Sequence, residues 1–314
     1  MKAQTDSFSQ PLFFISSTIL IIFRGIDMAE IKKITSPQNG TFKTACKWTK
    51  PKEARAEGVF LVEGIRWVRE ILAEKDWPVR GIWVSETLEK QDKAFMELLA
   101  EKAACPVVVI PDEMFRKLSD TETPQGVAAF AERRVRKVID VVKEAEKKSE
   151  KAGEKAAEKN ASGAPLLVIL ENLQDPGNVG TILRTLDAAG GTALVLTKGT
   201  ADIFSPKVVR AAMGSLLHVP VCLVESAAPL EEAIKKVGFT VLAATLENAK
   251  EPYDIPMDGK TAIVIGNEGN GLSAEAVASA SQGVKIPMLG KAESLNASVA
   301  AGILIYEAVR QRRS

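Results

Sequence analysis

The chain has 314 residues, of which 46% are hydrophobic and 26% charged, which is typical of a soluble globular protein with room for two domains. Its formal net charge is +1, so a surface that binds nucleic acid must be local. One histidine and three scattered cysteines without a C-x-x-C spacing argue against a zinc site, Ser-His-Asp hydrolysis and disulfides. We therefore expect a cytoplasmic protein with no bound metal.

The first 27 residues are interpreted as an extension upstream of the folded protein. Their apolar run, Pro11 to Phe23, is about 13 residues long, whereas a helix needs about 20 to span a bilayer. No small-residue cleavage site follows the run, and Met28 begins a sequence typical of a soluble start. We expect residues 1–27 to be unstructured and no membrane to be involved; an uncleaved anchor is the alternative.

Residues 28–132 are expected to form a small α/β domain. The 3.6-residue spacing of apolar side chains predicts helices at 65–75 and 92–103. Apolar runs bounded by turn residues predict strands at 58–64, 79–86, 106–111 and 126–132.

A local basic patch precedes these elements. Between Ile31 and Arg55 there is one acidic residue, Glu53, while Asn39 and Trp48 are available for base contacts. The basic residues of the segment are Lys32, Lys33, Lys43, Lys47, Lys50, Lys52 and Arg55. The patch is interpreted as an RNA-binding surface, with a solvated charged run as the alternative.

Residues 133–163 are expected to be a charged, flexible linker that is helical in part. Past Val142 the segment is almost entirely Lys, Glu, Ala and Ser, with no apolar stripe that could be buried. The charges nearly balance, which argues against an RNA-binding arm.

From residue 164 to 314 strands and helices alternate strictly. The last helix is expected from about Leu295 to Arg312. Continuous apolar strands joined by helices predict a parallel sheet covered on both faces, with a ligand at the carboxyl ends of the strands. The strands are expected at 166–172, 192–198, 218–224, 240–246, 261–267 and 283–288.

The stretch "DPGNVGTILRT", Asp175 to Thr185, follows the first of these strands. Asp175 and the proline after it are helix-start residues. Arg184 falls opposite the apolar stripe, with Gly177 and Gly180 before it, so we expect it to stand over open backbone that nucleic acid or another subunit can approach. A solvated arginine is the alternative.

Two later stretches also combine glycine with polar side chains. In "IVIGNEGNGLS", Ile263 to Ser273, a buried strand runs into glycines that let backbone pass close to a ligand. In "KIPMLGKAESLNASVAAGILIYEA", Lys285 to Ala308, Ser294 is suited to cap the last helix.

Together the three stretches resemble, in order and spacing, the signature motifs of the SpoU (TrmH-type) RNA ribose 2′-O-methyltransferases of the SPOUT superfamily. The resemblance covers 166–312. Upstream, "ITSPQNGTFKTACKW", "GVFLVEG" and "TPQGVAAF" resemble the ribosomal-protein-like substrate-binding domain found before the catalytic domain in many members. The family resemblance implies an α/β SPOUT domain with a deep C-terminal trefoil knot and S-adenosyl-L-methionine as cofactor. It also implies a homodimer with a shared active site. The implied substrate is ribosomal RNA, with transfer RNA as the alternative.

The resemblance also implies roles for single residues. Arg184 matches the family's essential arginine, which either takes the proton of the 2′-hydroxyl or orients the RNA. The other implied catalytic positions are Asn178, Glu268, Ser294 and Asn296. The implied cofactor-binding positions are Leu246, Gly266, Ile286 and Leu295. The expected RNA-binding residues are Lys32, Lys33, Asn39, Lys43, Lys47 and Arg55.

Two other classes of function fit the sequence less well. A non-catalytic RNA-binding homologue would be expected to have lost some of the polar motif residues, which are all present. A nucleotide-dependent oxidoreductase is disfavoured because no G-x-G-x-x-G follows a strand.

Overall fold

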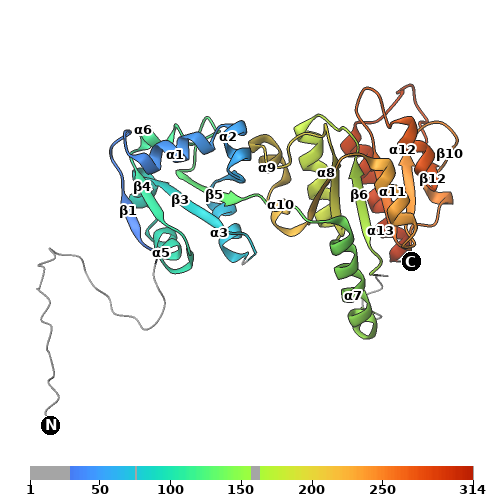
Figure 1. Cartoon of the computed structure of the whole chain (residues 1–314), viewed down its shortest axis with the longest axis horizontal. Coiled ribbons are helices and arrows are strands. Elements are labelled where there is room, and N and C mark those ends of the chain that lie inside the picture. Colours follow the sequence, from blue (N-terminus) through green and yellow to red (C-terminus); the bar gives the residue numbers. More distant parts are fainter. Residues whose placement is uncertain (1–28, 75, 157–162, 314) are drawn as a thin grey trace, which may run out of the picture.

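The structure is a computed structural model that describes residues 29–74, 76–156 and 163–313, so the expected extension 1–27 lies outside the described residues. Two α/β domains lie side by side (Figure 1), with α9 (Pro206–Ala212) and α10 (Ser215–His218) between them. Among the described residues, no helix is long and apolar enough to cross a bilayer.

The first domain is built on a mixed sheet with the strand order β1-β4-β3-β5-β2. Strand β5 runs antiparallel to both of its neighbours, whereas β3, β4 and β1 are parallel to one another. The strands are β1 (Ile31–Lys33), β2 (Val59–Glu63), β3 (Val79–Ser85), β4 (Val107–Ile110) and β5 (Val127–Glu132). The helices are α1 (Gly40–Trp48), α2 (Pro51–Ala56), α3 (Ile65–Ala73), α4 (Glu86–Gln91), α5 (Lys93–Lys102) and α6 (Asp112–Phe115).

The basic segment before β2 contains elements that the sequence patterns did not reveal. Helix α1 begins where the Asn39 side chain accepts hydrogen bonds from the backbone N–H groups of Thr41 and Phe42. Phe42 and Ala45 are buried against the sheet, while the lysines of this helix face outward. The helix is therefore amphipathic, and its narrow apolar side was hidden among the charges.

The second domain contains a parallel sheet with the strand order β10-β12-β9-β11-β6-β7-β8. Its strands are β6 (Leu166–Leu170), β7 (Ala193–Thr197), β8 (Val221–Val224), β9 (Thr240–Ala244), β10 (Ala249–Lys250), β11 (Thr261–Ile265) and β12 (Gln282–Val284). Its further helices are α7 (Val138–Ala156), α8 (Pro176–Ala188), α11 (Ala227–Lys235), α12 (Ala274–Ser279) and α13 (Ala297–Arg312), with a 3-10 turn η1 (Pro252–Asp254).

Both faces of this sheet are covered. In β6, Leu166, Val168 and Leu170 join the cluster packed by α8, α9 and α13. The alternating residues Leu167 and Ile169 join the cluster packed by α7, α11 and α12. This confirms the prediction of a parallel sheet with helices on both sides.

The expected linker is attached to the second domain from its beginning. The backbone N–H of Arg136 donates to the carbonyl of Val221 at 2.8 Å and so extends the edge of the sheet beside β8. Val138, Val141 and Val142, spaced for one face of a helix, are buried in the first turns of α7. The first part of the expected linker is therefore packed on the second domain as the start of a helix, and residues 157–162 of it lie outside the described residues.

The ends of two elements differ from the sequence-based expectation. His218 ends α10 instead of entering a strand, and β8 begins three residues later, at Val221. Helix α13 is capped by Asn296, which accepts from the N–H groups of Ser298 and Val299, and not by Ser294. Strand β12 pairs with β9, and α13 packs on β11 and α8. The trefoil knot expected in this region stays a prediction.

Candidate active site

A cleft of about 1070 Å³ lies at the carboxyl ends of β9, β11 and β12. It is bounded by the segments that follow these strands, by α12 and by the first turns of α13. Four of its lining residues are those predicted to bind the cofactor: Leu246, Gly266, Ile286 and Leu295. The cleft is thus where a parallel sheet is expected to hold its ligand.

Gly266 is required by the packing of its own loop. A Cβ at this position would lie 2.3 Å from the backbone carbon of Gly271 and 2.5 Å from the backbone nitrogen of Leu272. The neighbouring residue, Asn267, exchanges backbone hydrogen bonds with Gly271 at 2.9 and 3.0 Å. The glycine therefore closes the loop tightly on itself and in this way shapes the wall of the cleft.

Three of the predicted catalytic side chains meet beside this cleft. The Asn178 Nδ2 donates to Glu268 Oε1 at 3.1 Å, and Asn296 Nδ2 donates to Asn178 Oδ1 at 2.9 Å. Asn178 is buried, with 8% of its surface exposed. The chain thus brings together the start of α8, the segment after β11 and the N-cap of α13.

Glu268 is surrounded by hydrogen-bond donors. Its carboxylate accepts from the backbone N–H groups of Asp175 at 3.1 Å and Gln174 at 3.3 Å, in addition to Asn178. Burial alone would raise its pKa, but the bonds from its own backbone N–H, Asn178 and these two backbone groups outweigh it and lower the pKa. Glu268 is therefore ionised at neutral pH and weakly basic.

The start of α8 follows the predicted capping pattern. Asp175 accepts from the backbone N–H of Asn178 at 2.7 Å, with a proline at the first helical position. The expected role of Gly180 was wrong, because this glycine is buried against α9 and does not expose backbone beneath Arg184. A Cβ there would lie 2.5 Å from the Cβ of Ala211 and 2.8 Å from the carbonyl oxygen of Val208.

Arg184 and Ser294 lie apart from the three-residue network. Arg184 is exposed on α8, does not line the cleft, and makes no hydrogen bond or ion pair within the described part of the chain. Ser294 lines the cleft and is exposed. Arg184 is therefore accessible to a molecule that approaches α8 from outside.

The residues expected to bind RNA divide into two groups. One group already has partners within the protein: Lys32 lies 2.9 Å from Glu30, Lys33 lies 2.8 Å from Glu89, and Arg55 lies 3.1 Å from Asp202. The side-chain oxygen of Asn39 caps α1. Lys43 and Lys47 are exposed on α1 without an ion pair among the described residues. Trp48, also considered for base contacts, packs edge-on against Phe130, with ring centroids 5.4 Å apart.

Asn267, for which the sequence patterns indicated no role, organises the loop after β11. Its Oδ1 accepts from the backbone N–H groups of Gly269 and Asn270, at 2.9 and 3.1 Å, and its Nδ2 donates to the carbonyl of Asn172 at 2.9 Å. An asparagine directly before a glycine-rich turn is the signal for such a loop-closing side chain. Within the described residues, no three His, Cys, Asp or Glu side chains gather as metal ligands would.

The comparisons with known proteins agree with this geometry. The sequence model of the SpoU rRNA Methylase family matches residues 165–306, and that of the MRM3-like substrate binding domain matches residues 39–129. The chain is 33% identical to the 23S rRNA (guanosine(2553)-2′-O)-methyltransferase RlmP of Bacillus subtilis (strain 168), over 88% of this chain and 98% of that protein.

Two solved structures show the likeness over a similar share of the chain. The SpoU methyltransferase AviRb from Streptomyces viridochromogenes in complex with the cofactor AdoMet has a TM-score of 0.73 and 27% identity, over 88% of this chain and 99% of that one. The AdoMet-bound rRNA methyltransferase from Sinorhizobium meliloti has a TM-score of 0.72 and 26% identity, over 89% of this chain and 98% of that one. The motifs, the fold and the relatives lead to one conclusion: the chain belongs to the SpoU family of RNA methyltransferases.

Proposed function

We propose that this protein transfers a methyl group from S-adenosyl-L-methionine to a ribose 2′-hydroxyl of ribosomal RNA, as a homodimer in the cytoplasm. The observation that carries the proposal is the meeting of Asn178, Glu268 and Asn296 beside the cleft, because these side chains come from three distant motifs. A site that had lost its activity would have no reason to retain this connected network.

The cleft suits the proposed cofactor. Leu246 and Leu295 are apolar side chains that line it, yet 65% and 36% of their surfaces are exposed. Exposed leucines beside glycine-rich backbone offer a flat apolar surface to an adenine ring and backbone polar groups to its edge. When bound, S-adenosyl-L-methionine supplies an electrophilic methyl group.

The side chains around the cleft have separate roles in this proposal. Glu268 holds Asn178 and the start of α8 in place and is too weakly basic to remove a proton from a hydroxyl. Arg184 binds a phosphate of the RNA and orients the ribose, since a guanidinium stays protonated in proteins and its fork matches phosphate oxygens. The 2′-hydroxyl then gives its proton to a water molecule, because neither Glu268 nor Arg184 can accept it.

The position of Arg184 supports a homodimer. Arg184 is outside the cofactor cleft of its own chain, on the exposed side of α8. The neighbouring helix α13 exposes Val299 and Tyr306, at 49% and 50% of their surfaces, which is typical of a face that a second subunit covers. In the dimer, Arg184 of one protomer serves the cleft of its partner.

The substrate-binding domain supports ribosomal RNA as the target. The likeness to RlmP, which is named for 23S rRNA, includes this domain. Lys43 and Lys47 lie on the exposed side of α1 and have no ion pair within the part of the chain that the structure describes, so we expect them to contact RNA phosphates. Mapping ribose methylation in the RNA of a deletion strain identifies the nucleotide, and a missing methyl group in transfer RNA would contradict the ribosomal assignment.

The role of Arg184 is tested with Arg184→Ala. We expect kcat for methyl transfer to fall by at least about a hundredfold, because a charged group that contacts the reacting RNA is lost. The dimer and the affinity for S-adenosyl-L-methionine, measured by ultracentrifugation and titration calorimetry, are expected to stay unchanged. Arg313→Ala, which removes an exposed arginine at the far end of α13, serves as the control. Substantial methyl transfer by Arg184→Ala would overturn this role.

A further inference from the structure

The boundary between the two domains is a continuous apolar core. Phe60 on β2 and Phe204 before α9 are almost fully buried, and their ring centroids lie 5.2 Å apart. Trp77 packs edge-on against Phe60 and donates from its indole Nε1 to the carbonyl of Leu217, at 3.1 Å, across the boundary. The domains therefore share a fixed contact in place of a mobile hinge.

An arginine fork crosses this boundary beside the aromatic core. Arg133 Nη1 and Nη2 reach the two carboxylate oxygens of Asp202, at 3.3 and 3.0 Å, with only 14% and 19% of the two side chains exposed. Arg133 also donates from Nε to the carbonyl of Val59 at 2.9 Å and lies over the Phe204 ring. A bidentate, half-buried pair of this kind is strong and directional.

The second arginine on Asp202 contributes less. Arg55 lies 3.1 Å from the same carboxylate, but 69% of its side chain is exposed, so solvent screens the pair. The fork from Arg133 is therefore the contact that fixes the direction of Asp202. Since Arg133 follows β5 directly, the fork joins the sheet of the substrate-binding domain to the segment before α9.

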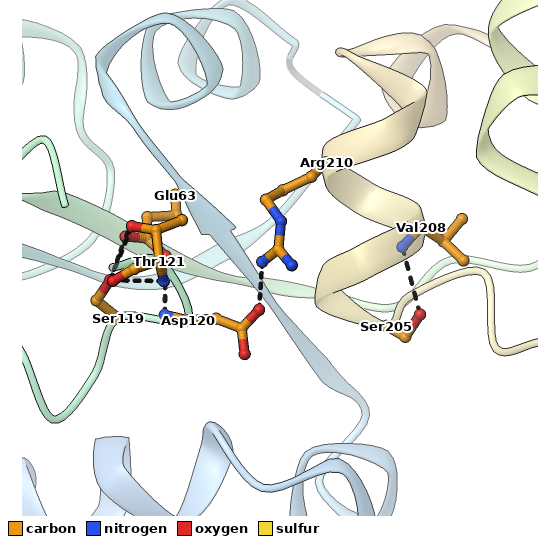
Figure 2. A network of polar contacts seen from close by, with 7 residues as sticks. All are labelled: Glu63, Ser119, Asp120, Thr121, Ser205, Val208 and Arg210. Carbon is orange, nitrogen blue, oxygen red and sulfur yellow. Dashed lines mark hydrogen bonds and ion pairs between the residues drawn. The ribbon is translucent and has the colours of Figure 1, made fainter. Parts of the chain in front are cut away.

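A polar network also joins α9 to the substrate-binding domain (Figure 2). Arg210 of α9 pairs with Asp120 of the substrate-binding domain. The loop that carries Asp120 is held by Glu63, which accepts from the backbone N–H of Asp120 at 3.0 Å and from the Thr121 hydroxyl at 2.7 Å. The partner of Arg210 is therefore tied to the end of β2.

Helix α9 is also locked to the catalytic helix α8. Gly180 leaves no space between the two helices, because a Cβ there would overlap Ala211. Helix α8 carries Asn178 at its start and Arg184 one turn after Gly180. A continuous path of rigid contacts thus runs from the substrate-binding domain through α9 to the residues that we assign to the reaction.

We propose that Asp202 and Arg133 are positioning residues that determine which nucleotide is methylated, by holding the substrate-binding domain at a fixed distance and angle from Arg184. This inference rests on the proposed function. RNA bound by the substrate-binding domain can place only one ribose at Arg184 of the same chain if the two domains do not move relative to each other. A displacement of about 1 Å at a reacting group can lower a rate by about a hundredfold.

The test is Asp202→Asn, which removes the negative charge that faces Arg133. The side-chain oxygen of the asparagine can still accept the hydrogen bond that Asp202 accepts from the backbone N–H of Phe204. The matched control is Glu225→Gln, in a pair with Lys198 that is exposed on both sides. Each protein is supplied with S-adenosyl-L-methionine and unmodified ribosomal RNA, and the methylated riboses are mapped. For Asp202→Asn we expect methylation spread over neighbouring nucleotides and kcat at least about tenfold lower, with Kd values for cofactor and RNA within about threefold of wild type.

The outcomes separate this inference from the proposed function. If wild-type protein methylates one nucleotide and Asp202→Asn methylates the same one at the same kcat, the inference is wrong and the proposed function stands. If wild-type protein methylates no RNA, the proposed function itself fails. If Asp202→Asn does not fold, Arg133→Lys is the deciding variant, because lysine keeps the positive charge but cannot form the two-pronged contact with Asp202. An unchanged kcat and an unchanged position of methylation in Arg133→Lys would overturn the inference.

Discussion

The carboxyl group of Glu231 on α11 is buried against α12, and the Ser279 hydroxyl donates to its Oε2 at 2.8 Å. Its other oxygen has no hydrogen-bond partner among the described residues. Burial raises the pKa of Glu231 to about 7, although the bond from Ser279 opposes the shift. The folded protein therefore holds a proton on Glu231 at pH values where the unfolded chain has released it.

This shift predicts how Glu231→Gln changes stability with pH. Because the folded pKa is raised, the contribution of Glu231 is full below its ordinary pKa of 4.5 and is lost as the pH rises through about 7. We expect the variant to match wild type near about pH 4 and to be more stable by about 1–3 kcal/mol near about pH 8. Urea unfolding at both pH values measures this. An equal difference at the two pH values would contradict the assignment.

Single residues also show where sequence reasoning ends. Arg55 and Asn39 were expected at the RNA, and the structure uses Arg55 for an ion pair with Asp202 and Asn39 for a helix cap. Asparagine is a preferred N-cap residue, but the sequence patterns did not predict the helix that Asn39 caps. The ion pair was not accessible, since its partner lies 147 positions further along the chain.

At the scale of helices, the contact between α8 and α9 is tested with Gly180→Ala. Alanine favours a helix by about 1 kcal/mol over glycine, but its Cβ would lie 2.5 Å from the Cβ of Ala211. Overpacking of this kind costs about 1–3 kcal/mol, so we expect a net loss of stability or a displaced α9.

Gly302→Ala on α13 is the matched control, because its Cβ would meet Thr185 at an ordinary 3.8 Å. We expect this variant to be as stable as wild type or up to about 1 kcal/mol more stable. Thermal unfolding by calorimetry compares the three proteins. The proposed contact would be refuted if Gly180→Ala gained as much stability as Gly302→Ala.

The elements of the second domain were the most predictable. The strands at 166–170, 193–197 and 261–265 lie within the ranges expected for them, because they are buried on both faces and read as uninterrupted apolar runs. Strand β10, with two residues, is too short to leave a pattern. Hydrophobic periodicity therefore predicts long, buried strands and helices well. It predicts short elements, and amphipathic helices at a charged surface, poorly.

The arrangement of the whole molecule was predicted less by periodicity than by the motifs. Alternating strands and helices imply a parallel sheet, but they do not imply that β12 lies between β9 and β10. Nor did the patterns reveal that Glu268 and Asn296 both contact Asn178, because they lie 90 and 118 positions from it along the chain. Only the family resemblance connected these residues before the structure did.

The end of the chain is tied to the start of the sheet by Arg312. Its guanidinium donates to the carbonyls of Met257 at 3.1 Å, Ala164 at 2.9 Å, Pro165 at 3.3 Å and Gly259 at 2.8 Å. These groups lie just before β6 and β11, the two central strands of the catalytic sheet. Helix α13 is thereby anchored at its last turn, while its first turns line the cleft that we propose for the cofactor.

Arg312→Ala should therefore affect both stability and cofactor binding. Loss of these charge-assisted hydrogen bonds is expected to cost about 2–4 kcal/mol of unfolding free energy. Because α13 is then free to shift against the cleft, we expect Kd for S-adenosyl-L-methionine to rise roughly tenfold, equal to about 1.4 kcal/mol. Calorimetric unfolding and titration measure the two effects, with Arg313→Ala as the exposed neighbouring control. A variant that is destabilised but binds the cofactor as wild type does would show that the anchor and the cleft are uncoupled.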